Sequence, residues 1–251
     1  PRGAEHAAYW RKTLEGLPPA PPLTGDLTPG PVRDNAGGFV RIALTEEVSR
    51  GVQELAVRCG ATPFMVCTAA VRVLLHRLTG TTDVALGTVS AGRSSLALAH
   101  EVGLFANTVV LRTAYDPAAG FARLVEDCVR TALDAQEHED HPFDQLVRDL
   151  DVPRQPGRNP LFDVLVETVI SGTAETAAAG DGETVRHLRT EDKVSDFDLS
   201  FSFLIPPTGS SDATEVWVGH RADLFTRDAA RALGERLHAL LGELLEDPAA
   251  E

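Results

Sequence analysis

The amino-acid sequence predicts an α/β or α+β sandwich, in which helices cover a mixed sheet. Segments with the apolar spacing of helices alternate with short apolar segments that are typical of strands. Near the end of the chain, residues 197–205 and 215–219 both read as strands and are separated by a turn, which indicates a hairpin. Hydrophobic residues make up 43% of the 251 residues, and this globular composition excludes a wholly disordered chain.

The N-terminal 38 residues are predicted to form a separate leading segment. Residues 1–16 have the pattern of a short amphipathic helix, and residues 17–38 contain six prolines and four glycines. Prolines at that density prevent both helix formation and strand pairing, so this linker is expected to run extended over a surface. The main unit is predicted to span residues 39–251 and to open with a strand at 39–44.

The remaining elements follow from capping residues and apolar spacing. Thr45 and Gly60 frame a helix with one apolar face, and the next helix begins at Pro63 and is apolar almost all round, as a core helix is. Residues 171–183 are small and polar and predict a loop. Further helices are expected at 121–132, 142–150 and 226–244, and further strands at 84–89, within 102–113, and at 161–170.

Charge and cysteine content exclude several classes of function. The net charge is −14, which disfavours nucleic acid and anionic membrane surfaces as partners. The three cysteines, Cys59, Cys67 and Cys128, are widely spaced and form no CxxC pair, so we expect small buried side chains in a reducing compartment. With neither a membrane-length apolar run nor a signal-peptide pattern, the sequence predicts a cytoplasmic location.

No complete catalytic constellation is found in the residues themselves. The cluster at 138–141, His-Glu-Asp-His, has two histidines that a metal would suit, but the following proline pushes the second away from helical geometry, so we predict a helix end and no metal site. Asn107 and Thr108 interrupt an apolar strand and are either satisfied core groups or side chains that face a substrate channel. Arg158 either binds an anionic group or pairs with a neighbouring acid, and Asp198 alone reads as a solvated strand residue.

Taken together, the segments resemble the C-terminal half of a nonribosomal peptide synthetase condensation domain. The three most specific matches are VGLFANTVVLR (102–112) with the family's IGFFVNTLVLR, HEDHPFD (138–144) with HQDLPFE, and RNPL (158–161), which is intact. Weaker matches lie at 8–11, 61–65, 83–93, 197–199 and 223–225. The chain departs from the family at 195–196, where Ser-Asp replaces the usual Lys, and it contains no HHxxxDG catalytic motif.

The resemblance implies a chloramphenicol acetyltransferase-like fold, of which this chain would be one lobe. In that family a tunnel runs between two lobes, and carrier proteins deliver acyl or aminoacyl thioesters on phosphopantetheine arms for peptide-bond formation. The chain would bind no cofactor directly and would supply no catalytic residue, and its partners would be the N-terminal lobe and the carrier proteins. Arg154 and Arg158 are candidates for a basic patch that meets an acidic carrier. By motif position, the expected tunnel residues are Asn107, Thr108, Arg158, Asn159 and Asp198, and the expected architectural residues are His138 and Asp140, which would brace the lobe interior, with Pro142 and Phe143.

Two functional hypotheses follow from this resemblance. The first is a lobe of a condensation enzyme that is inactive alone, excised from a longer chain, and prone to self-association through the face that the other lobe would cover. The second is a non-catalytic condensation-like module that recruits a carrier protein or a tailoring enzyme. A third and weaker reading, an acyltransferase of the same superfamily that uses coenzyme A, fits the set of motifs less well.

Overall fold

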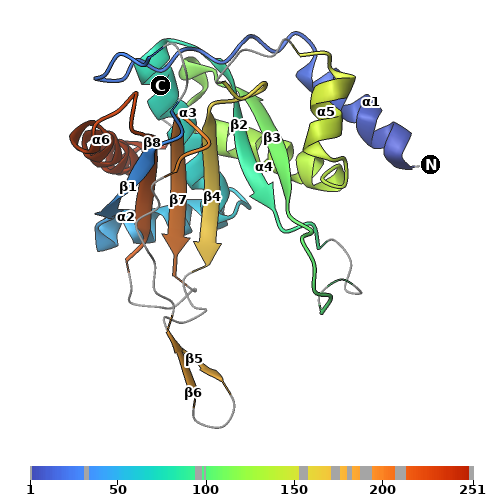
Figure 1. Ribbon diagram of the computed structural model, residues 1–251. Coiled ribbons are helices and arrows are strands. Elements are labelled where there is room, and N and C mark those ends of the chain that lie inside the picture. The colour runs from blue at the N-terminus through green and yellow to red at the C-terminus, as the bar shows by residue number, and fades with distance from the viewer. Residues whose placement is uncertain are drawn as a thin grey trace.

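The computed structural model in Figure 1 describes residues 2–30, 34–93, 98, 100–152, 158–170, 176–179, 183–186, 194–206 and 213–248. The helices are α1 (Arg2–Leu14), α2 (Glu46–Arg58), α3 (Pro63–Thr79), the short 3-10 helix η2 (Pro117–Ala119), α4 (Phe121–Glu137), α5 (Phe143–Asp149) and α6 (Arg227–Glu246). The strands are β1 (Gly37–Ala43), β2 (Asp83–Ser90), β3 (Asn107–Ala114), β4 (Val164–Ile170), β5 (Thr176–Ala179), β6 (Glu183–Arg186), β7 (Leu199–Ile205) and β8 (Glu215–Arg221).

A six-stranded mixed sheet in the order β1-β8-β7-β4-β2-β3 forms the centre of the molecule. Strand β4 pairs in parallel with both β2 and β7, whereas the other pairs in this sheet are antiparallel. The predicted mixed sheet with covering helices is therefore confirmed, and so is the late hairpin, which is β7–β8.

Two hydrophobic clusters pack against the sheet. The larger one gathers apolar side chains from α2, α3, α4 and α6 against the strands. The smaller one lies against β2, β3 and β4 and includes Trp10 and Leu14 of α1 and Leu146 of α5. Helix α1 is thus packed through its apolar face, while residues 15–30, which contain neither helix nor strand, run along one end of the sheet (Figure 1).

Helix α3 is buried, as predicted, but it carries a charge into the core. Arg72 is 4% exposed and donates hydrogen bonds to the carbonyl oxygens of Val84 (2.6 Å), Leu111 (2.7 Å) and Thr113 (3.1 Å). Backbone carbonyls of β2 and β3 therefore hold both terminal nitrogens of the guanidinium, whereas the buried Nε has no hydrogen-bond partner among the described residues. This arrangement fastens α3 to that end of the sheet.

The prediction of a loop at 171–183 is partly wrong. Residues 176–179 form β5, which pairs antiparallel with β6. The intervening sequence Gly-Asp-Gly is of the kind that favours tight hairpin turns, and backbone pairing does not require large side chains. Residues 171–175 and 180–182 of that predicted loop lie outside the described residues. Figure 1 shows the hairpin projecting from the end of the sheet where β4 and β7 finish.

The helices in the described part of the chain are too short or too polar to span a membrane singly. The pair α2 and α3, bent by 108° with respect to each other, is long and apolar enough only when the two helices are taken together.

Thiol reactivity is expected to distinguish the three cysteines. Cys67 and Cys128 are buried, and burial raises the pKa of the Cys67 thiol to about 12, whereas Cys59 is half-buried. Because the thiolate is the reactive form, a thiol reagent at pH 8 should label Cys59 alone in the folded protein and all three in urea. Mass spectrometry of labelled peptides measures this, with Cys59→Ser as the control that removes the native signal. Fast labelling of Cys67 without unfolding would contradict the structure.

Candidate functional site

Asn107, at the start of β3, contacts the segment that contains the predicted residues His138 to Phe143. The Asn107 side chain donates from Nδ2 to the carbonyl oxygens of Glu139 (2.7 Å) and His141 (2.9 Å), and its Oδ1 accepts a hydrogen bond from the backbone N–H of Phe143 (3.2 Å). Its amide is therefore engaged on both the donor and acceptor sides, which favours the satisfied core group over a side chain free to meet a substrate. Thr108, next to it, pairs with Val89 in the β2–β3 ladder.

The turn that Asn107 holds separates two helices, as the sequence predicts. Helix α4 ends at Glu137, and α5 begins at Phe143 with Pro142 in extended geometry before it. His138 contacts α1: its ring stacks on Tyr9 at 3.9 Å, its Nδ1 lies 2.8 Å from Nδ1 of His6, and its carbonyl accepts from the Trp10 indole at 3.1 Å.

Asp140 does not take the interior position expected for it. Its side chain is exposed, whereas Glu139 and His141 are the buried members of the cluster, and His141 Nε2 lies 3.2 Å from Oδ2 of Asp149 on α5. The Asn107 side chain holds the His141 backbone carbonyl, and the His141 ring reaches the last residue of the following helix, whereas the Asp140 side chain faces outward. Among the residues that the structure describes, no group of three or more His, Cys, Asp or Glu side chains is placed to hold a metal.

An aromatic cluster joins three of the predicted motifs. The Phe162 ring is fully buried and lies 5.8 Å from Phe143, at an interplanar angle of 60°, and 5.6 Å from Phe197, at 20°. On β2, Gly87 lies under this ring, because a Cβ atom there would stand 2.0 Å from Phe162. Short motifs that are far apart in the sequence are therefore parts of one packed unit.

Arg158 pairs with a neighbouring acid, which is the second of the two readings left open for it. Its Nε donates to Oδ2 of Asp163 at 3.0 Å, and its Nη2 donates to the same oxygen and, at 2.9 Å, to the Ala20 carbonyl of the linker. Asn159 shapes the same turn, since its Oδ1 accepts from the backbone N–H of Leu161 at 3.3 Å. Arg154, the other basic candidate, lies outside the described residues.

Asp198 is buried, so the solvated position that its sequence context suggested is wrong. Its side chain is 7% exposed, and its Oδ1 accepts a hydrogen bond from Nη1 of Arg221 at 2.7 Å. The β7–β8 register explains this, because Leu199 pairs with His220 and the preceding and following residues are thereby brought together. Asp198 is anchored further by its backbone N–H, which donates to the Asp163 carbonyl at 3.0 Å.

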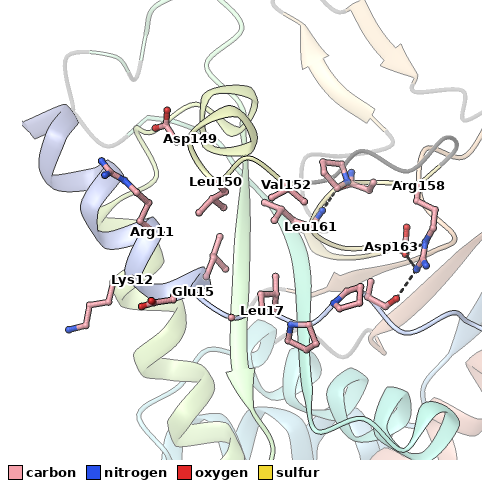
Figure 2. Close-up of a pocket in the computed structure, with 17 residues that line it drawn as sticks. Arg11, Lys12, Glu15, Leu17, Asp149, Leu150, Val152, Arg158, Leu161 and Asp163 are labelled. Carbon is pink, nitrogen blue, oxygen red and sulfur yellow. Dashed lines mark hydrogen bonds and ion pairs between the residues drawn. The ribbon is translucent and has the colours of Figure 1, made fainter.

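Two large cavities border these groups. The first, which we name the α1–α5 cavity, has a volume of about 890 Å³ and lies between α1, α5 and residues 158–163. Figure 2 shows Leu150, Val152 and Leu161 between the α1 side chains and the pair Arg158–Asp163. Arg158 and Asn159 line this cavity, whereas Asn107, Thr108 and Asp198 are not among the described residues that line either one.

The second, which we name the strand-end cavity, has a volume of about 590 Å³. It is lined from β2 by Thr88 to Ser90, from β4 by Thr168 and from β7 by Ile205. Those three strands are parallel to one another, so the cavity lies at their shared carboxyl ends, where open α/β sheets commonly bind ligands. Sequence reasoning missed it because no single motif marks a place that the ends of three strands, a fourth strand (β3) and three helices (α2, α3 and α4) build together.

Replacing Asn107 with alanine is expected to lower the free energy of unfolding by about 1–3 kcal/mol, because two carbonyls and one N–H of the turn lose their partner. Urea denaturation measures the change. Thr108→Ser is the control and should stay within about 0.5 kcal/mol of the parent. An Asn107→Ala variant as stable as the parent would show that the turn does not depend on this amide.

Comparison with known proteins identifies the family of this chain. A family model described as the condensation domain matches residues 1–251. The chain is 38% identical over 245 residues to a probable non-canonical nonribosomal peptide synthetase, CymA, of Salinispora arenicola, and 31% identical over 247 residues to surfactin synthase subunit 2 of Bacillus subtilis. Each match covers 98% of this chain, but only 3% and 7% of the respective relatives.

Solved structures agree with the fold. The X-domain from teicoplanin biosynthesis superposes with a TM-score of 0.87 at 24% identity, over 98% of this chain and 55% of that one. The fold is therefore the one that the resemblance implied, and the family match extends over the whole sequence. This chain belongs to the condensation-domain family.

Proposed function

We propose that these residues form the C-terminal lobe of a nonribosomal peptide synthetase condensation domain. The lobe contributes one wall of a substrate tunnel and one side of the docking surface for carrier proteins, during amide-bond formation between carrier-bound thioesters. In this proposal the reacting groups arrive on phosphopantetheine arms, and the catalytic motif, which this sequence lacks, comes from a second lobe. Of the expected tunnel residues, Arg158 and Asn159 line the α1–α5 cavity. Asn107 and Asp198 line neither cavity, but each bonds to a residue that does: Asn107 to Glu139, and Asp198 to Asp163.

The observation that carries the proposal is an exposed apolar segment. Val102 is 101% exposed and Leu104 is 93% exposed, in the residues that lead into β3. Figure 1 shows this segment projecting beside the sheet toward the same end as the β5–β6 hairpin. Large apolar side chains left in water near each other mark a surface that another body covers. A second lobe is the occupant that the family predicts.

Binding to the N-terminal lobe of the same domain tests this proposal. We expect a complex between the two lobes that is weakened at least about tenfold by Leu104→Asp, because a carboxylate replaces an apolar contact. The matched control is Val57→Asp, since Val57 is 82% exposed and lies on α2. Isothermal titration calorimetry measures the affinity of both variants for the N-terminal lobe. Absence of a complex, or equal effects of the two substitutions, would contradict the proposed interface.

The same surface explains the expected self-association of the lobe alone. At high concentration the parent chain should sediment partly as a dimer, and Leu104→Asp should shift it to the monomer. A parent chain that stays monomeric throughout would argue against an uncovered interface.

A second candidate function is a non-catalytic module that recruits a carrier or a tailoring enzyme. It is favoured by the X-domain from teicoplanin biosynthesis, which has been solved in complex with OxyB and superposes on this chain with a TM-score of 0.85. Transfer activity of the two lobes combined separates the candidates. Product supports the catalytic lobe, and a stable but inactive pair of lobes supports the recruitment module.

A further inference from the structure

The strand-end cavity has the size and the walls of a ligand site. Its volume of about 590 Å³ lies within the usual range for small-molecule pockets. Apolar side chains from α3, β3 and α4 make up much of the wall, among them Phe64, Met65, Val109, Leu111 and Ala132. Neutral hydrogen-bonding groups are spread between them, as at Gln53 and Thr168.

Glu139 is the one charged side chain among the described residues that line this cavity. It is 8% exposed, and its Oε2 accepts a hydrogen bond from the Ser90 hydroxyl at 2.5 Å. The position of the residue is fixed by Asn107, which holds its carbonyl oxygen at 2.7 Å. The carboxylate is therefore a rigid part of the wall.

Within the described part of the chain, no Lys, Arg or His forms an ion pair with Glu139. One neutral hydroxyl compensates only part of the cost of removing an ionised carboxylate from water. The site is electrostatically incomplete and favours a ligand that brings a positive charge, whereas an anionic ligand would be repelled.

We propose that the strand-end cavity receives the side chain of an aminoacyl substrate that ends in an ammonium or guanidinium group, with Glu139 as its ionic partner. This inference rests on the proposed function, which brings aminoacyl groups to the domain. The apolar wall suits the methylene stem of such a side chain, and the buried carboxylate suits its charged end. The α-amine of the substrate is a poor candidate for the same place, because it must lose its proton to attack a thioester and a carboxylate would stabilise the protonated form.

The experiment measures the binding of three pantetheine-linked aminoacyl amides to this chain by calorimetry at pH 7. The probes carry lysine, norleucine or Nε-acetyl-lysine. All three have the same α-amine and similar stems, so differences report the charge at the end of the side chain. We expect the lysyl probe to bind at least about tenfold more tightly than either neutral probe.

The variant Glu139→Gln should remove that preference, since an amide can still accept the Ser90 hydrogen bond but carries no charge. Glu137→Gln is the matched control, because Glu137 is exposed at the end of α4 and the change in net charge is the same. It should leave the preference intact.

Equal binding of the three probes, no binding of any, or a lysyl preference that survives in Glu139→Gln would overturn the inference. The comparison of the three probes on the parent chain tests the inference even if a variant folds poorly. Each of these outcomes is independent of the binding of the N-terminal lobe. A lobe that binds its partner without preferring the lysyl probe leaves the proposed function standing and removes only this inference.

Discussion

Replacing Arg221 with leucine is expected to lower the free energy of unfolding by about 3–5 kcal/mol, the cost typical of breaking a buried ion pair from one side. The Arg221 side chain is 7% exposed and bonds to Asp198, also 7% exposed, and through Nε to Asp223. Removing it takes away the positive charge and the Nη1 hydrogen bond that the buried Asp198 carboxylate receives from Arg221. Urea denaturation of the two chains measures the difference.

The double variant Arg221→Leu with Asp198→Leu should recover much of that loss, because a buried ion pair replaced by apolar side chains is often close to neutral. Arg148→Leu is the control: Arg148 pairs with Asp144 on the surface of α5, at 64% and 75% exposure, and should cost less than about 1 kcal/mol. A loss below about 1 kcal/mol in Arg221→Leu would mean that Asp198 is not held by this pair. Asp198 would then again be a candidate for a direct role in the tunnel.

Replacing Gly87 with alanine is expected to cost about 2–3 kcal/mol, because the new methyl group overlaps the Phe162 ring. The added Cβ would lie 2.0 and 2.2 Å from two ring atoms, and the ring is held between Phe143 and Phe197 and cannot swing away freely. Chemical denaturation of the purified variant checks this value.

A smaller side chain at position 162 should relieve the overlap. The pair Gly87→Ala with Phe162→Leu is expected to show a favourable coupling of about 1 kcal/mol or more in a double-mutant cycle. Gly3→Ala serves as the control, because nothing lies within 4 Å of a Cβ at that helical position and alanine favours the helix. Additive effects of the two core substitutions would show that the ring does not set the need for glycine.

The elements that the sequence predicts correctly are those with local causes. Thr45 caps α2 through a bond from the Val48 N–H, Thr226 caps α6 through the Ala229 N–H, and Gly80 ends α3 in the left-handed conformation at φ 71°. Each signal lies within a few residues of its effect, so a single sequence is enough to read it.

The contacts of the candidate site depend on register and on distant chain segments instead. The pairing of Asp198 with Arg221 follows from the alignment of β7 with β8, and the carbonyls around Arg72 come from two strands. Neither partner is visible in the local pattern of the other. In the same way, Asp140 and His141 are both polar in sequence, and the inward position of the His141 ring depends on its contact with Asp149, eight residues further along the chain.

Transfer of an aminoacyl group between two loaded carrier proteins is the most direct measurement of whether this chain is one lobe of a condensation enzyme. We expect no product above background with this chain alone, since its sequence has no HHxxxDG motif, and product when an N-terminal lobe that carries the motif is added. Turnover by this chain alone would contradict that role.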